Sequence, residues 1–137
     1  MVLFILIDMN LIDKYKDVIE CGRGWYPLLI PILEYVEKYN NEHKDKLEIE
    51  QIKEKFSILR IYTNYSIPEL EDLIDKAEDL SDITCERCGS TKEVGKTFGW
   101  ITTICHECAQ ELANKKDTEF KWKKDGITYI IKPNKEN

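Results

Sequence analysis

The clearest pattern of apolar and polar positions along the chain lies in residues 67–80. Apolar residues recur there every three or four positions, so they fall within one arc at 100° per residue. Ser66 and Glu69 have the spacing of a capping box at the start of this segment. The pattern predicts an amphipathic helix over 67–80. Its core-facing side consists of Ile67, Leu70, Leu73, Ile74, Ala77 and Leu80.

The opposite side of this predicted helix is densely acidic and contains one basic residue, Lys76. A solvent-exposed helix face is the simpler interpretation of such a strip of charge. A contact surface for a basic partner is the alternative. The strip consists of Glu69, Glu71, Asp72, Asp75, Glu78, Asp79 and Asp82. On the second interpretation, the partner-binding residues are Glu71, Asp72, Asp75, Glu78 and Asp79.

The residues before this segment predict further helices. Residues 2–7 fit either a helix or a strand, and residues 11–20 fit a helix. Gly22 and Gly24 interrupt the pattern. Another helix is expected over 31–39, with both prolines of WYPLLIP at its start.

Strands are predicted in two places. Residues of β type alternate or cluster in 47–51 and 58–62, on either side of a turn at 54–57, so two paired strands are expected. Near the C-terminus, an Asp-Gly pair between residues 120–123 and 127–131 favours a hairpin turn. Together with the helices, these strands place the chain in the α+β class.

Four cysteines carry the most specific chemical signal in the chain. Cys85 and Cys88 form one Cys-x-x-Cys step, and Cys105 and Cys108 form a second one after sixteen intervening residues. Each step lets a tight turn aim two thiolates at one ion, and two steps supply the four ligands of a tetrahedral zinc site. Two disulfides or ordinary buried thiols are the alternatives. We expect one structural Zn²⁺, with no coordination position left for catalysis.

The sequence around these cysteines resembles a treble-clef zinc finger over residues 84–116. Gly89 follows the first pair where a knuckle favours a positive φ, and residues 91–104 predict a β-hairpin. The second pair lies at the start of a predicted helix, where backbone N–H groups favour thiolates. His106 is a possible replacement for one cysteine ligand, but a place outside the metal shell is expected. Treble-clef fingers serve many unrelated functions, so this resemblance implies no activity.

Length and composition indicate a small folded protein. The chain has 137 residues, and 42% of them are hydrophobic, which suffices for a small core. The apolar run near the N-terminus is too short for a signal peptide or a membrane span, so a cytoplasmic protein with reduced thiols is expected. Cys21 is expected to be a small buried or partly buried thiol, with a nucleophile as the alternative. Trp25, Tyr26 and Trp100 are expected in the core.

Charge is distributed unevenly along the chain. We expect an acidic α+β part over 1–83 and a zinc-finger part with the C-terminal hairpin over 84–137, joined in one compact unit. The first contains 10 basic and 18 acidic residues and the second 10 and 8, which gives the net charge of −6. A protein that binds nucleic acid directly usually has a basic face, because it neutralises phosphates. Strong direct binding to nucleic acid is therefore not expected.

The lysine-rich C-terminal hairpin supports a second hypothesis, a nucleic-acid-binding regulator. Basic residues surround Trp122 there, and such a mixture of basic and aromatic side chains can bind nucleic acid. An amphipathic strand explains the same alternation more simply. The lysines are Lys115, Lys116, Lys121, Lys123 and Lys124.

Catalysis is not expected. HNH nucleases also use treble-clef scaffolds, but they need a general-base histidine and a separate metal-binding histidine or asparagine in the finger. His106 lies between cysteine ligands, and no second histidine follows it in the finger. No glycine-rich phosphate-binding loop is present. A degenerate HNH-like nuclease is the third hypothesis.

The leading hypothesis comes from a resemblance that covers residues 21–109. The segments CGRGWYPLL and QIKEKFSILRIY, the acidic helix and the cysteine finger resemble a small group of phage and prophage proteins. Small acidic phage proteins with a structural metal include inhibitors of CRISPR effector nucleases, and this chain is similar to such a type II anti-CRISPR metalloprotein. The resemblance implies a non-enzymatic inhibitor that binds a host nucleic-acid-processing protein, foremost a CRISPR effector nuclease. An acidic surface on such an inhibitor can occupy a basic channel and block nucleic-acid loading.

Overall fold

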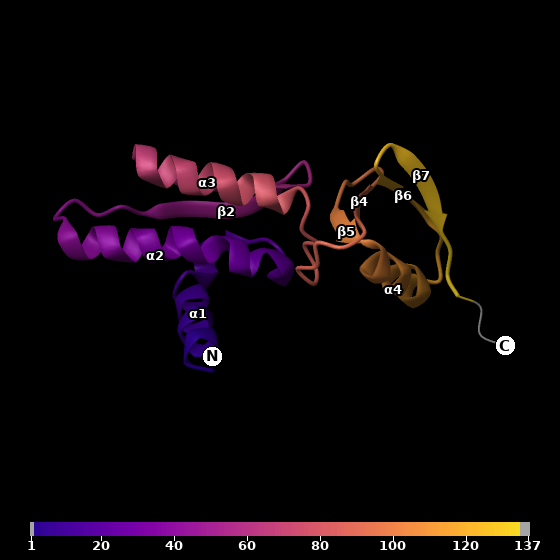
Figure 1. Ribbon diagram of the computed structural model, residues 1–137, viewed down its shortest axis with the longest axis horizontal. Helices are drawn as coiled ribbons and strands as arrows, with labels where there is room; N and C mark the ends of the chain where they lie inside the picture. Colours follow the sequence, from indigo (N-terminus) through magenta and orange to yellow (C-terminus); the bar gives the residue numbers. More distant parts are fainter. Residues whose placement is uncertain (1, 135–137) are drawn as a thin grey trace.

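A computed structural model of the chain describes residues 2–134 and has the predicted α+β architecture. Figure 1 shows the arrangement of its helices and strands. The α-helices are α1 (Val2–Lys14), α2 (Tyr26–Glu42), α3 (Pro68–Ser81) and α4 (His106–Lys116). The strands are β1 (Ile19–Glu20), β2 (Ile49–Lys55), β3 (Ile58–Thr63), β4 (Val94–Thr97), β5 (Thr103–Cys105), β6 (Phe120–Lys124) and β7 (Ile127–Ile131).

The first part of the chain combines α2 and α3 with a three-stranded sheet of order β1-β2-β3. β1 is parallel to β2, and β2 is antiparallel to β3. The two helices contact each other and run alongside β2, whereas α1 projects away from the body of the molecule (Figure 1). Buried side chains from α2, α3, β2, β3 and the segments next to them form one hydrophobic core. It consists of Trp25, Leu29, Ile32, Leu33, Val36, Leu47, Ile49, Ile52, Leu59, Ile61, Leu70, Ile74 and Ala77.

The second part is a four-stranded antiparallel sheet of order β5-β4-β6-β7, with α4 packed against β5 and β7. Trp122 of β6 is only 2% exposed, and its Nε1 atom donates a hydrogen bond of 2.9 Å to the carbonyl oxygen of Ile104. A second hydrophobic core surrounds this ring. It consists of Cys85, Ile104, Cys105, Cys108, Ala109, Ala113, Trp122 and Ile131.

The helix predicted over residues 11–20 is wrong in its extent. α1 runs from Val2 to Lys14, and the chain continues through a short 3₁₀ turn into β1. Ile19 pairs with Ile52, and Glu20 pairs with Lys53 in the sheet. This pairing supplies a strand neighbour 33 residues away, which overrides the local helical pattern.

None of the helices within residues 2–134 is long and apolar enough to cross a membrane.

α2 is longer than the helix predicted over 31–39, because it begins at Tyr26. Pro27 lies in its first turn as predicted, but Pro31 lies inside the helix instead of at its start. Proline removes one backbone hydrogen bond at this position. Burial of Leu29 and Ile32 on either side of Pro31 favours a helix in spite of that loss.

α3 matches its prediction to within one residue at each end, but its predicted cap does not form. Ile67 is the N-cap residue and no side chain caps the helix, while the Ser66 hydroxyl donates a hydrogen bond of 3.2 Å to Glu71. Leu70, Ile74 and Ala77 are buried as predicted. Leu80 is 37% exposed, so the last position of the predicted core face does not lie in the core.

All three predicted hairpins are present, as the antiparallel pairs β2–β3, β4–β5 and β6–β7. The turn predicted over 54–57 is shorter than expected, because β2 continues to Lys55. Phe56 and Ser57 form the turn between β2 and β3, with φ of 53° and 70°. Asp125 and Gly126 form the turn between β6 and β7, with φ of 51° and 78°. Two consecutive residues with positive φ match the right-handed twist of paired strands. The Asp-Gly pair favours this conformation, whereas Phe56 adopts it without such a preference.

Candidate metal centre

The four predicted ligand cysteines converge on one point. The sulfur atoms of Cys85, Cys88, Cys105 and Cys108 all lie within 4.8 Å of one another, and those of Cys88 and Cys105 are 3.7 Å apart. Metal–sulfur bonds of about 2.3 Å place the sulfurs of a tetrahedral site about 3.8 Å apart. No disulfide links the cysteines of the described residues. The group is therefore positioned to hold a metal ion.

A knuckle turn carries the first two cysteines. The Gly89 backbone N–H donates a hydrogen bond of 2.9 Å to the Cys85 carbonyl, and the Cys85 N–H donates one of 2.8 Å to the Ser90 carbonyl. Gly89 has a φ of 82°, which other residues rarely adopt. This turn aims Cys85 inward, where it is buried, while Cys88 lies at the exposed edge of the site.

The β4–β5 hairpin and α4 carry the other two cysteines. Cys105 ends β5 and is the N-cap residue of α4, and its Sγ atom accepts a hydrogen bond of 3.4 Å from the Cys108 backbone N–H. The positive end of the helix dipole favours negative charge on both sulfurs. Arg87, between the first two cysteines, donates a hydrogen bond of 3.1 Å to the Cys108 carbonyl. Knuckle, hairpin and helix follow one another in the order of a treble-clef finger.

The electrostatics of the cluster favour a bound cation. Burial raises the pKa of Cys105 and of Cys108, and neighbouring sulfurs add to the rise. Burial also opposes the thiolate of Cys85, but backbone N–H groups outweigh it and lower the Cys85 pKa. Four thiolates in contact repel one another, so they need a positive ion between them.

A glycine-containing segment of the first part packs directly on the knuckle. The Gly24 N–H donates a hydrogen bond of 2.7 Å to the Glu86 carbonyl, and the Gly22 N–H donates one of 2.9 Å to the Glu86 carboxylate. The indole N–H of Trp25 donates one of 2.8 Å to the Thr84 carbonyl. The metal centre is therefore tied to the core of the first part through the CGRGW segment.

Sequence reasoning identified the two glycines as a break in the helical pattern and missed this contact. A Cβ atom on Gly24 would lie 2.2 Å from the Cys85 carbonyl oxygen, and one on Gly22 would lie 2.5 Å from the Glu86 carbonyl oxygen. Such distances exclude a side chain. The sequence did contain a signal for this contact. Two glycines flank an arginine directly before a tryptophan that is buried, and closely spaced glycines can indicate a close approach of two backbones.

Two other candidate residues lie near the centre without joining it. His106 is exposed and packs edge-on against Trp122, with ring centroids 5.4 Å apart. Cys21 is half-buried, and burial, followed by the Glu86 charge, raises the pKa of its thiol to about 12. Such a thiol is almost fully protonated at neutral pH. Within residues 2–134, no other group of three or more His, Cys, Asp or Glu side chains is arranged to hold a metal ion.

The five acidic residues of α3 that were predicted to bind a partner divide into two sets. Asp72, Asp75 and Asp79 are exposed, and none of them forms an ion pair within the described residues. Glu71 is half-buried beside Ser66. Glu78 is half-buried and lies 3.3 Å from Arg60. The three aspartates form the freely accessible row, and the two glutamates are partly engaged within the molecule.

Of the three tryptophans, two are buried and one departs from its prediction. Trp122 is buried, and Lys121 and Lys123 are exposed on either side of it, so β6 is the predicted amphipathic strand. Trp100, expected in the core, is 83% exposed at the tip of the β4–β5 hairpin. The prediction for Trp25 is confirmed, because that ring is fully buried.

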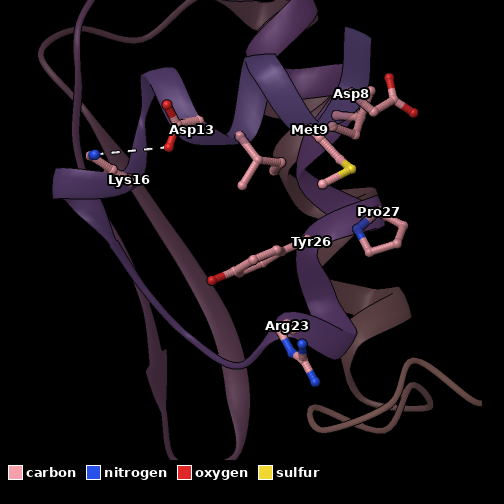
Figure 2. Close-up of a pocket in the computed structure, with 9 residues that line it drawn as sticks. Asp8, Met9, Asp13, Lys16, Arg23, Tyr26 and Pro27 are labelled. Atoms are coloured by element: carbon pink, nitrogen blue, oxygen red, sulfur yellow. Dashed lines mark ion pairs between the residues drawn. The ribbon is translucent and has the colours of Figure 1, made fainter. Parts of the chain in front are cut away.

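A separate hollow of about 510 Å³ lies between α1 and the beginning of α2 (Figure 2). Met9 and Tyr26 line its mainly apolar wall. Asp13 and Lys16 form an ion pair of 3.8 Å at its edge. Asp8 and Arg23 also line it, so its two acidic and two basic residues balance and indicate no charged ligand.

Comparison with known proteins identifies no relative of the chain. No protein-family model matches it, and neither does a curated protein or a solved structure. The resemblance to phage inhibitors therefore stays a prediction.

Proposed function

We propose that the chain is a non-enzymatic zinc protein that binds a basic partner protein through the acidic face of α3. The observation that carries this proposal is the exposed row of Asp72, Asp75 and Asp79, which has no ion pair within the described residues. Like charges three and four residues apart on a helix destabilise it by a few tenths of a kcal/mol per pair, and Lys76, four residues after Asp72, offsets only part of this cost. A favourable role outside the isolated chain would offset this cost.

Zinc is the metal that the four cysteines favour. Thiolates in a closed group of four with tetrahedral spacing are typical ligands of structural zinc. An ion held by four protein ligands has no free position for a substrate or a water molecule. The role of this ion is to hold the knuckle, the hairpin and α4 together, and so to fix the surface that packs on the CGRGW segment.

The expected partner is a protein whose basic surface otherwise binds nucleic acid. At 1.5 Å of helix rise per residue, the aspartate row extends for about 10 Å, which is close to the Debye length in physiological salt. It can therefore act on a basic channel as one block of negative charge and exclude a nucleic acid from it. A CRISPR effector nuclease in the host cytoplasm is the first such partner to test, because the resemblance to anti-CRISPR metalloproteins implies it.

An affinity pull-down from infected host cells tests this proposal. The bait is the full chain, compared with the variant that combines Asp72→Asn, Asp75→Asn and Asp79→Asn. A matched control combines Glu34→Gln, Glu48→Gln and Glu50→Gln, three exposed acidic residues elsewhere in the first part. We expect wild type and control to retain a nucleic-acid-binding protein that elutes with salt, and the aspartate variant to lose it.

Single aspartate substitutions are expected to have little effect, because exposed charge pairs are individually weak. Purified partner then gives the decisive comparison, through its affinity for each variant and its own nucleic-acid binding in their presence. Equal affinity of wild type and the triple aspartate variant would remove α3 from the interface. Loss of affinity in the control as well would indicate a general effect of net charge.

The two alternative functions have weaker support. A regulator that stacks bases on the C-terminal hairpin would need an accessible Trp122, and this ring is 2% exposed. An HNH-like nuclease would need a second catalytic or metal-binding group near His106, and the other histidine, His43, lies at the end of α2. Incubation with DNA or RNA and divalent metal ions is expected to show no cleavage.

A further inference from the structure

A groove of about 400 Å³ lies on the zinc-bearing part, away from α3. Its walls come from the tip of the β4–β5 hairpin, the end of α4 and the beginning of β6. The charged and aromatic side chains that line it are Arg87, Phe98, Trp100, Lys116, Phe120 and Lys121. The remaining lining residues are threonines and aliphatic residues.

The charge of this groove is opposite to that of the whole chain. Three cationic side chains line it, and no acidic residue is among its described lining residues, although the chain has a net charge of −6. Arg87, Lys116 and Lys121 form no ion pair within residues 2–134. Asp117 and Glu119 adjoin lining residues in the chain but do not line the groove themselves, so the side chains at its surface are basic, aromatic or neutral.

Two aromatic rings at the hairpin tip are exposed in spite of their size. Trp100 is 83% exposed and Phe98 is 49% exposed. The loop that carries them is braced, because the Thr97 hydroxyl donates a hydrogen bond of 2.9 Å to the Trp100 carbonyl and accepts one of 2.8 Å from the Thr102 N–H. The backbone N–H of Thr97 also donates one of 3.0 Å to the Thr102 carbonyl. These hydrogen bonds close the loop that carries the exposed rings of Trp100 and Phe98.

The occupant must use both the cations and the rings. An acidic peptide would pair with the cations but has no general need for exposed rings, and an apolar helix would cover the rings but leave three cations desolvated. A single strand of nucleic acid places phosphates against basic side chains and stacks its bases on aromatic rings. We propose that this groove binds single-stranded nucleic acid, with Trp100 and Phe98 as the stacking surface and Arg87, Lys116 and Lys121 as phosphate contacts.

Binding at this groove is expected to be modest and strongly salt-dependent. Three phosphate contacts on a single strand predict a slope of about −2 when the logarithm of the association constant is plotted against the logarithm of salt concentration. This site does not depend on the acidic face of α3. The triple aspartate variant should therefore bind an oligonucleotide at least as well as wild type does, which separates the two proposals.

Fluorescence anisotropy with the zinc-loaded full chain tests the groove. The probes are fluorescein-labelled oligo(dT) and oligo(rU) of about 12 nucleotides, which have exposed bases, and a DNA duplex of equal length. We expect the single strands to bind better than the duplex at about 50 mM salt. Trp100→Ala and Lys121→Gln are each expected to weaken binding by about tenfold. Lys123→Gln, on the same strand but outside the groove, should change it by less than about twofold.

A spectroscopic variant keeps the test independent of folding. Trp25 and Trp122 are buried, so stacking of a base should quench the emission of Trp100 alone. Trp100→Phe should retain binding of the oligonucleotide and lose this quenching. Failure of both single strands to bind, equal affinity of wild type and Trp100→Ala, or equal affinity for single strands and duplex would each overturn the proposal.

Discussion

Gly24 lies against the backbone of the knuckle, in the contact between the two parts of the molecule. A Cβ atom there would lie 2.2 Å from the Cys85 carbonyl oxygen and 2.6 Å from the backbone carbon of Glu86. Both are main-chain atoms, which cannot rotate away as a side chain can. Local sequence patterns do not reveal this contact, because it joins distant parts of the chain. Gly22, which contacts the same knuckle, lies 64 positions from its partner Glu86.

Gly24→Ala is therefore expected to destabilise the folded protein by about 3 kcal/mol, because the knuckle must move to admit the methyl group. It should also weaken zinc retention. Gly126→Ala is the matched control: no atom lies within 4 Å of the added Cβ, and only the φ of 78° opposes alanine, at a cost of about 1 kcal/mol. Urea unfolding and zinc titration measure both effects. Equal losses in the two variants would contradict the close contact at Gly24.

The individual cysteines differ in their expected roles. Cys88→Ser removes one of the four converging sulfurs, so it should lower the zinc content of the purified protein and its melting temperature. Cys21→Ser makes the same atomic change outside the cluster and should leave the zinc content unchanged. Elemental analysis after dialysis against a weak chelator distinguishes the two. Full zinc retention by Cys88→Ser would be incompatible with the ligand assignment.

At the scale of elements, local signals predicted those helices and strands whose neighbours are close in sequence. α3 follows from its apolar period, and the turn at Asp125 and Gly126 follows from the preference of this pair for positive φ. The boundaries of α1 and α2 depend on distant partners. Ile19 leaves a helical pattern to pair with Ile52, and Pro31 remains inside α2 because buried leucine and isoleucine side chains surround it.

The contact between α1 and α2 makes a prediction that depends on pH. The Glu37 carboxylate accepts hydrogen bonds of 2.6 Å from Lys14 and 2.7 Å from Tyr15, and these bonds, that of Lys14 first, lower the Glu37 pKa from its usual 4.5. A lowered folded-state pKa contributes stability above the unfolded value, and this contribution is lost as the pH falls through the folded value. Wild type should therefore exceed Glu37→Gln in free energy of unfolding at pH 7.

That difference should therefore be smaller at about pH 3 than at pH 7, because about pH 3 is below the usual glutamate pKa and the contribution falls as the pH approaches the lowered folded value. Glu34→Gln, on an exposed side of the same helix, is the control and should show little difference from wild type at either pH. Urea unfolding at the two pH values provides the measurement. A difference between wild type and Glu37→Gln that is independent of pH would refute the charged network.

At the scale of the whole molecule, acidic and basic chemistry occupy different parts. The aspartate row lies on α3 in the first part, and the groove around Trp100 lies in the second. The sequence revealed the metal site because its ligands come in two recognisable pairs. It did not reveal the groove, because Arg87, Trp100 and Lys121 have no shared spacing and meet only through the fold.

The central structural claim is that four cysteines hold one zinc ion on which the second part depends. The core of the first part contains no ligand cysteine, so metal removal should affect the two parts unequally. Residues 85–131 should lose most of their protection against amide hydrogen exchange, and residues 49–63 and 68–81 should keep theirs.

Hydrogen exchange followed by mass spectrometry, before and after treatment with a chelator in reducing buffer, is the most direct measurement of this claim. Elemental analysis of the same samples gives the zinc content. The account predicts one zinc ion per chain and a selective loss of protection over residues 85–131 when it is removed. Protein purified without a bound metal, or unchanged protection of residues 85–131 after complete zinc removal, would contradict it.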